Sequence, residues 1–332
     1  MAAALAACAR RPEKPAKGGL DMARLNHAFP ALAARARPGV FAAGVLSLAA
    51  DQVWSSDDNG RYPLQGVAVV PIAAAALAEV DAGRLSLNEP IRIDSLDLSP
   101  PPSAINETWR GASNKHVTSM PAADLIALTV EKGDSTAADV IMKRIGGPGA
   151  VTAWLRARNI ENMRIDRYQR ELRQDIAGMA SFHPEWKGEA EWIAARNAVP
   201  PLQRQRAMDA FLVDSRDTTT VQGALHFLRL LSLGELLSVP STRLLLRLMS
   251  TGVDAGDRFR AGLPRGAAIS RKSGGARTDL GFSPTDDEIA VVTLPDGRRV
   301  LMAAFLAGST ATVVERDRLF ADTARLFTAA LS

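Results

Sequence analysis

The fold of this chain is decided by residues 61–91, RYPLQGVAVVPIAAAALAEVDAGRLSLNEPI. Residues 67–80 are apolar on every side of a helical wheel, and a helix without a polar face has to be buried. Pro71 fits such a helix only near its first turn. Residues 85–93 are predicted to be extended. The stretch therefore predicts a buried central helix with other elements packed around it.

The segments on both sides of this helix predict a sheet built from the two ends of the chain. Helical spacing covers residues 20–37, and a T-x-x-D pattern from Thr136 to Asp139 is typical of a helix start. Further helices are predicted at 121–130, 136–145, 150–158, 219–231, 242–249 and 313–331, and strands at 40–48, 52–55, 267–272, 278–282, 289–294 and 300–306. This order predicts an α+β fold in which a helical insertion separates the parts of an antiparallel sheet. Residues 159–218 show weak periodicity and much charge, which is typical of a long surface loop.

The composition excludes several kinds of site. The 332 residues include one cysteine, Cys8, and four scattered histidines, so we expect neither a thiolate metal site nor any other metal or cofactor. A net charge of +4, with arginines alternating with acidic residues, argues against a nucleic-acid partner. Only seven residues are lysines, and none lies between Lys17 and Lys115.

The N-terminus suggests a lipid anchor. The sequence Leu5-Ala6-Ala7-Cys8 resembles a bacterial lipobox, and residues 9–19 have the composition of a flexible tether. We therefore expect a periplasmic protein, lipid-anchored at Cys8 and touching the membrane only there. The alternative is a chance run of small residues before a free cysteine, because seven residues are too few for a signal peptide.

Five segments in order resemble the class A serine β-lactamases, which have the penicillin-recognising serine hydrolase fold. They are residues 61–91, DSTAADVIMKRIGGPGAVTAWL (134–155), IDRYQREL (165–172), RAGLPRG (260–266) and KSG (272–274). The resemblance implies a five-stranded antiparallel sheet flanked by helices, an all-α part, and an active site between them. It divides the chain into a tether (1–19), a sheet domain (20–60 and 215–332) and an all-α domain (61–214) with an Ω-like loop at about 160–185. It also implies a monomer.

The first motif of the family, S-x-x-K, supplies the nucleophile and its base. The corresponding positions here are Gly66 and Val69, which have no hydroxyl and no amine. No shift of register restores the pair, because residues 57–85 contain no Ser, Thr or Lys. In the whole chain no lysine follows a serine by three residues, and the nearest match is Thr129 with Lys132 on another helix.

The second motif, S-D-N, corresponds to Gly133-Asp134-Ser135. In the family its serine relays a proton to the leaving nitrogen, and glycine cannot do so. Asp134 has the residue type of a helix cap, so we expect a structural role for it. Ser135 replaces the asparagine that contacts the substrate side chain, which leaves a weakened binding contact.

The Ω-loop carboxylate that activates the deacylating water corresponds to Gln169, and an amide is no general base at neutral pH. We expect Arg167 and Glu171 to be structural. Arg173 stands where the family has an asparagine that helps to hold the water. The fourth motif, K-T-G, is kept as Lys272-Ser273-Gly274, whose charge and hydroxyl are expected to bind a substrate carboxylate; an exposed strand lysine is the alternative.

Three hypotheses follow. The first is a catalytically inactive β-lactamase-like protein that binds a β-lactam or a peptidoglycan-like small molecule. The second is an active serine hydrolase that uses an atypical nucleophile such as Ser135 or Ser273. The third is an interaction module of the cell envelope. Under the first, the substitutions Gly66→Ser, Val69→Lys, Gly133→Ser and Gln169→Glu together are expected to regain hydrolysis.

Overall fold

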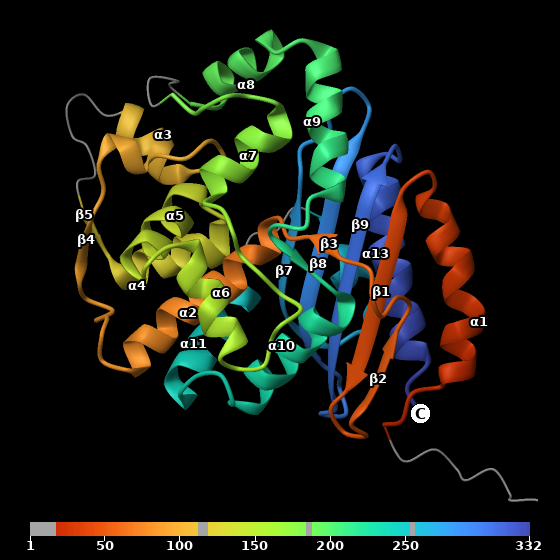
Figure 1. The fold of residues 1–332 in the computed structure, drawn as a ribbon. Coiled ribbons are helices and arrows are strands. Elements are labelled where there is room, and N and C mark those ends of the chain that lie inside the picture. The colour runs from red at the N-terminus through yellow and green to blue at the C-terminus, as the bar shows by residue number, and fades with distance from the viewer. Residues whose placement is uncertain (1–17, 112–118, 184–187, 253–255) are drawn as a thin grey trace, which may run out of the picture.

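A computed structural model describes residues 18–111, 119–183, 188–252 and 256–332, and a five-stranded antiparallel sheet lies at its centre (Figure 1). The strand order is β2-β1-β9-β8-β7. The strands are β1 (Val40–Ser47), β2 (Gln52–Ser55), β7 (Ala268–Gly275), β8 (Ser283–Thr293) and β9 (Arg299–Ser309). Because β1 pairs with β9, the two ends of the chain meet in the sheet. The predicted α+β fold with five antiparallel strands is confirmed.

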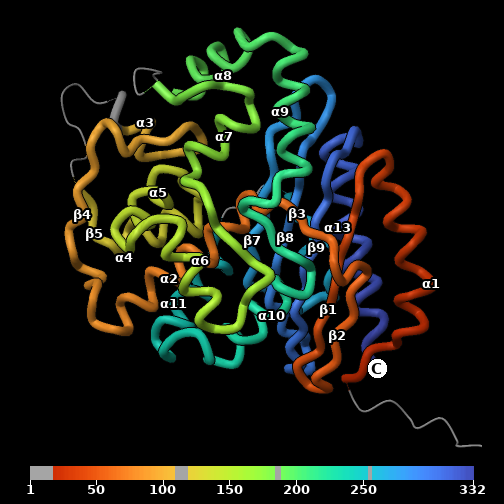
Figure 2. Tube along the Cα trace, viewed as in Figure 1, coloured from red at the N-terminus to blue at the C-terminus, as the bar shows by residue number. Residues whose placement is uncertain are grey.

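Helices from the chain ends cover the outer face of the sheet. They are α1 (Met22–Ala33), α12 (Arg258–Gly262) and α13 (Val313–Ala329), and α1 and α13 lie side by side on this face in Figures 1 and 2. Aromatic rings fill the layer between them and the strands, with Phe41 edge-on to Phe320 and Phe29 edge-on to Trp54. Alternate residues of β1 and β9 face this layer, since strand side chains alternate between faces.

The inner face carries the helical part of the molecule. Its centre is α2 (Val69–Asp81), in which every residue from Val69 to Ala78 is buried. The prediction of a buried helix is confirmed, and Pro71 lies in the first turn, where its missing N–H costs no hydrogen bond. Around α2 and along the sheet lie α4 (Ala122–Ala127), the π-helix η4 (Leu128–Lys132), α5 (Ser135–Arg144), α6 (Pro148–Arg156), α10 (Val221–Leu233) and α11 (Val239–Thr251).

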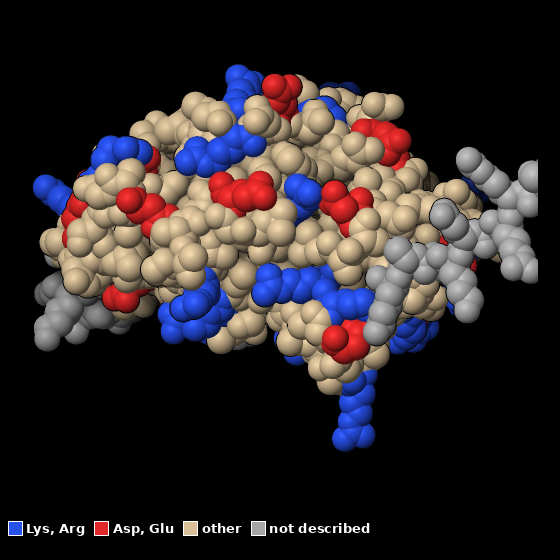
Figure 3. Space-filling model, turned by 90° about the horizontal axis from the view of Figure 1, so that it is seen from below, with Lys and Arg blue, Asp and Glu red and all other residues tan. Residues whose placement is uncertain are grey.

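The remaining elements are short or lie at the periphery. They are η1 (Ala34–Ala36), β3 (Tyr62–Pro63), η2 (Gly66–Ala68), β4 (Pro90–Arg92), η3 (Ser95–Asp97), α3 (Ala104–Gly111), β5 (Ser119–Pro121), α7 (Gln169–Ala177), α8 (Glu189–Ala198), α9 (Pro201–Val213) and β6 (Thr218–Thr219). In the described residues no helix is long and apolar enough to cross a membrane. Acidic and basic side chains are interspersed over the face shown in Figure 3.

Three local predictions are wrong. Residues 278–282 are no strand: Asp279 and Phe282 exchange backbone hydrogen bonds across a tight turn, because Leu280 and Gly281 adopt φ of 51° and 75°. The helix α5 is capped by Asp134, whose carboxylate accepts from Ala137 N, and not by Thr136. Residues 159–218, interpreted as a long loop, contain the three helices α7, α8 and α9.

Candidate functional site

A cleft of about 540 Å³ lies between the edge strand β7 and the helical part. Four places in the chain converge on it: Gly66 before α2, Gly133 after η4, Arg173 on α7, and the stretch Lys272–Ala276 at the end of β7. These segments are far apart in the sequence, and the family resemblance predicts that most of them lie together at the active site. Val69, Gln169 and Ser135, in contrast, are buried and do not line the cleft.

The floor of the cleft is a contact between two glycines. A Cβ built on Gly66 would lie 2.7 Å from Gly274 Cα and 2.8 Å from Ser273 O. A Cβ on Gly274 would lie 2.2 Å from Gly66 N. Because real Cβ atoms essentially never approach other atoms within 3.0 Å, the backbones of η2 and β7 touch here as only glycines allow.

A buried carboxylate, Asp287, lies directly beneath this contact. It stands opposite Gly274 in the β7–β8 ladder, and its Oδ2 accepts a hydrogen bond of 2.9 Å from Gln65 N. Its Oδ1 has no hydrogen-bond partner. Burial raises the pKa of Asp287 to about 7, although the Gln65 amide and the charges of Arg258 and Lys272 oppose the rise.

The neighbours of Asp287 on β8 point to the opposite face. Asp286 pairs with Arg258 at 2.5 Å, and Glu288 pairs with Arg271 at 2.9 Å. Arg258 also donates to Gly274 O at 2.8 Å and so fixes the end of β7. No family motif points to this group, although the run Asp286–Glu288 before the apolar strand residues 289–294 is a recognisable signal in the sequence.

The end of the cleft at η4 is open. Gly133 has a φ of 62°, and a Cβ there would meet nothing within 4 Å. Asp134 next to it accepts from Ile105 N, Ala137 N and Ser103 Oγ and so joins three segments. Ser135 is 1% exposed, and its hydroxyl donates to Pro102 O at 3.2 Å.

Gln169 begins α7 and is 4% exposed. Its backbone N–H donates 2.6 Å to Asp139 Oδ1, and Arg170 N donates to Asp139 Oδ2. Burial raises the pKa of Asp139 to about 6, while hydrogen bonds from Ser99, Arg170 and Gln169 lower it. The carboxylate at the start of α7 is therefore supplied by α5, and it holds backbone amides.

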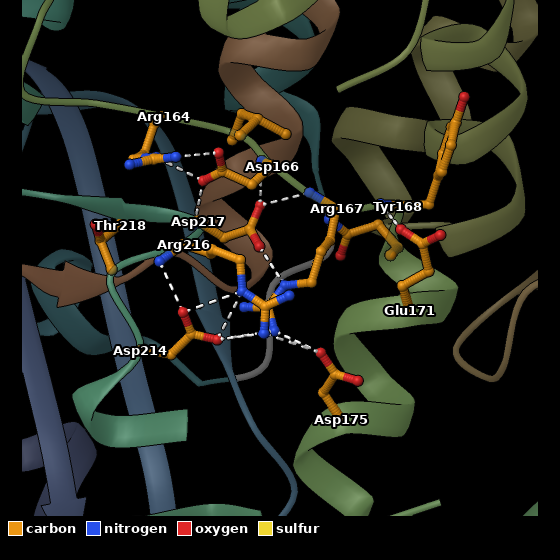
Figure 4. A network of polar contacts seen from close by, with 12 residues as sticks. Arg164, Asp166, Arg167, Tyr168, Glu171, Asp175, Asp214, Arg216, Asp217 and Thr218 are labelled. Carbon is orange, nitrogen blue, oxygen red and sulfur yellow. Dashed lines mark hydrogen bonds and ion pairs between the residues drawn. The ribbon is translucent and has the colours of Figure 1, made fainter. Parts of the chain in front are cut away.

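An ion-pair network closes the base of the segment that carries α7, α8 and α9 (Figure 4). Arg167 Nε lies 2.6 Å from Asp217 Oδ2, and both side chains are at most 5% exposed. Asp217 Oδ1 also accepts from Asp166 N and Arg167 N. Arg167 and Asp217, fifty positions apart, are thus fixed side by side. The segment between them, residues 168–216, leaves the rest of the fold and returns to it at this ion pair, and we call it the excursion. Glu171 accepts from Tyr168 N within the first turn of α7.

This excursion covers one side of the cleft with apolar side chains, which the sequence analysis did not foresee. The cleft-lining residues from α7, α8 and α9 include Ile176, Ala177, Trp192 and Met208. Arg204 of α9 pairs with Asp279 in the turn between β7 and β8 at 2.8 Å. The helices are thereby attached to the sheet beside Lys272, Ser273 and Gly274.

The fold and the cleft together define a β-lactamase-like protein of two parts, with its candidate site between a five-stranded sheet and a helical part. The chain belongs to the Beta-lactamase enzyme family, whose sequence profile matches residues 24–331. In the described residues no group of three or more His, Cys, Asp and Glu side chains could hold a metal ion. Cys8, the expected lipidation site, lies outside the described residues.

Relatives and solved structures agree with this assignment. The chain is 24% identical over 272 residues to beta-lactamase VEB-1 of Pseudomonas aeruginosa, covering 81% of this chain and 78% of that protein. It is 22% identical over 284 residues to the extended-spectrum beta-lactamase PER-1 of the same organism, covering 82% and 79%. The structure matches an ancestral (GNCA) class A beta-lactamase with a TM-score of 0.71 and 28% identity, covering 92% and 99%. A beta-lactamase from Chitinophaga pinensis matches in fold, with a TM-score of 0.73 and 24% identity over 92% and 98% of the two chains.

Proposed function

We propose that this protein is a β-lactamase-family member that binds a β-lactam or a peptidoglycan-like ligand without hydrolysing it. The observation that carries the proposal is the Gly66–Gly274 contact. The position that corresponds to the family's nucleophile has no side chain, and the neighbouring backbone leaves no room for one. Acyl transfer needs an activated hydroxyl and a base, and loss of either typically costs several orders of magnitude in rate.

The other motif positions support the same proposal. Val69 is 3% exposed in the apolar core and has no amine to act as a base. Gly133 has no hydroxyl for proton relay, and Gln169 has no carboxylate and lies outside the cleft lining. Lys272 and Ser273 both line the cleft, so they are the groups that we assign to binding a ligand carboxylate. A charged donor beside a hydroxyl is a suitable pair for such a group.

Intact-protein mass spectrometry after incubation with benzylpenicillin tests the proposal. We expect no acyl adduct, no turnover of a chromogenic cephalosporin, and a measurable heat of binding in titration calorimetry that Lys272→Ala removes. An adduct would contradict it, and peptide mapping of that adduct would then identify the nucleophile. Ser273 is the candidate to examine first, because it lines the cleft whereas Ser135 is buried against Pro102.

We also propose that the protein acts as a monomer in the periplasm, anchored through a lipid on Cys8. The support is the sequence Leu5–Cys8 followed by a tether-like segment. Metabolic labelling with a palmitate analogue, compared between the wild type and Cys8→Ser, tests the anchor. Light scattering of the purified protein tests the oligomeric state.

A further inference from the structure

The cleft carries two cations near Gly133: Lys132, and Arg173 at the position where the family has an asparagine. Arg173 of α7 and Lys132 at the end of η4 both line the cleft beside Gly133. Apart from its two chain neighbours, no residue has an atom within 4 Å of the place where a Gly133 Cβ would stand, so there is room for a ligand group beside Gly133. Lys132 is exposed, whereas Arg173 is half-buried.

The guanidinium of Arg173 has no counterion among the described residues. Its Nη1 donates to Pro101 O at 3.2 Å, and its Nε is buried without a hydrogen-bond partner. Burial lowers the pKa of Arg173 to about 10, so the group remains charged at neutral pH. A desolvated cation without a partner is costly, and an incoming anion relieves that cost.

The carboxylates nearest to Arg173 are already engaged. Asp139 accepts from Ser99 Oγ, Gln169 N and Arg170 N, and Asp134 accepts from Ser103 Oγ, Ile105 N and Ala137 N. Both favour the charged form of Arg173 through space but form no ion pair with it. Glu107 also lines the cleft, and it is exposed.

We propose that Arg173 and Lys132 form a second anion-binding subsite, so that the cleft takes ligands with two carboxylates. This inference rests on the proposed function in one respect: Lys272 and Ser273 are taken to bind the first carboxylate of the ligand. The second carboxylate occupies the space beside Gly133. Arg173 supplies the main contact, because its donors are planar and partly buried, and Lys132 adds attraction that salt screens.

Two penicillins that differ by one carboxylate test the subsite. Carbenicillin is benzylpenicillin with an additional carboxylate on the side chain. In titration calorimetry at low salt we expect carbenicillin to bind about tenfold more tightly than benzylpenicillin, as one charge-assisted contact provides. Arg173→Gln should remove this preference, so that the two penicillins bind with equal affinity, and Arg173→Lys should restore part of it.

A matched control removes the same charge elsewhere. Arg206 is exposed on α9 and does not line the cleft, so Arg206→Gln should keep the full preference for carbenicillin. Glu107→Gln should increase the preference. Thermal unfolding of each variant establishes that it is folded. Equal affinity of the wild-type protein for both penicillins would overturn the inference.

Fragments of the side chains separate this inference from the proposed function. Phenylmalonate has two carboxylates on the carbon that carries its phenyl ring, as the side chain of carbenicillin suggests. Phenylacetate has the same ring but only one carboxylate. If neither penicillin binds, the proposed function fails, yet phenylmalonate binding that exceeds phenylacetate binding and disappears in Arg173→Gln still supports the subsite. If phenylmalonate binding does not depend on Arg173, the subsite does not exist.

Discussion

Gly66 and Gly274 are in backbone contact across the floor of the cleft, and neither position has room for a Cβ atom. The atoms that a Gly66 Cβ would meet, at 2.7 and 2.8 Å, are both backbone atoms of β7. Backbone cannot rotate away as a flexible side chain can. The two glycines therefore join the start of the α2 region to the edge of the sheet, at the position that we propose corresponds to the family's nucleophile.

The first prediction concerns Gly66→Ser. The new side chain must push β7 away from η2, and we expect a loss of about 1–3 kcal/mol in the free energy of unfolding. Chemical denaturation measures it. Gly149→Ser is the control, because Gly149 lies in the first turn of α6 and a Cβ there would meet nothing within 4 Å. Equal stability of the two variants would show that η2 and β7 can separate at Gly66 and Gly274 without loss of stability.

This contact also affects what we expect of the fourfold variant with Gly66→Ser, Val69→Lys, Gly133→Ser and Gln169→Glu. From the sequence alone, each of the four changes would restore one catalytic group without affecting the backbone. In the structure, Gly66→Ser requires β7 to move away from residue 66, and Gly133→Ser has to adopt a φ of 62°. We expect turnover of a chromogenic cephalosporin only in preparations that also show a displaced β7 by hydrogen exchange.

The second prediction concerns the pH dependence of stability through Asp287. Its pKa is raised to about 7 in the folded protein, whereas an aspartate in the unfolded chain ionises near pH 4. Between about pH 4 and pH 7 the unfolded state therefore loses a proton that the folded state keeps, and stability falls as the pH rises. Asp287→Asn removes this contribution. Its stability relative to the wild type should increase across that window by on the order of a few kcal/mol.

Asp81 supplies a control of opposite sign for this experiment. Burial raises the pKa of Asp81, but hydrogen bonds from Ser238 and Ser241 outweigh it and the net shift is downward. The carboxylate therefore stabilises the fold above its unfolded pKa, and the contribution is lost as the pH falls. Asp81→Asn should accordingly lose stability relative to the wild type only as the pH rises toward about 4, and the difference should stay constant between about pH 4 and pH 7. Parallel curves for Asp287→Asn and the wild type would refute the assignment.

The third prediction concerns the ion pair at the base of the excursion. Arg167 and Asp217 are 5% and 3% exposed, and removal of one partner leaves a buried charge. We expect Arg167→Ala to destabilise the protein by about 3–5 kcal/mol. Arg216 pairs with Asp214 nearby but is 49% exposed, so Arg216→Ala should cost less than about 1 kcal/mol. Urea unfolding of both variants measures the difference, and comparable losses would contradict the buried role of Arg167.

The sequence predicted the sheet, the buried helix and the family because each depends on local patterns. The apolar run of α2 and the strands β1 and β9 are visible in residue order alone. The turn at residues 278–282 was missed, because a leucine at positive φ carries no sequence signal. The helices α7, α8 and α9 were missed because their many charged residues obscure the helical periodicity. What positions α9 is its packing on α7 and β8, and these contacts leave no pattern along the chain. The Gly66–Gly274 contact joins residues two hundred positions apart, and no pattern along the chain encodes it.

The last prediction concerns the attachment of α8 and α9 to the sheet. Asp279 accepts from Arg204 at 2.8 Å and lies 3.9 Å from Arg196, and all three side chains are at most 12% exposed. Asp279→Ala leaves two largely buried guanidinium groups without their carboxylate, which should cost about 3 kcal/mol or more. Because Arg167 and Asp217 still close the base of the excursion, the loss should be local. Hydrogen exchange in residues 189–213 should accelerate while β8 and β9 stay protected.

Asp296→Ala is the control, since Asp296 forms an exposed pair with Arg298 in the turn between β8 and β9. Equal exchange in both variants would mean that the apolar wall around Trp192 and Met208, and not Asp279, holds these helices over the cleft.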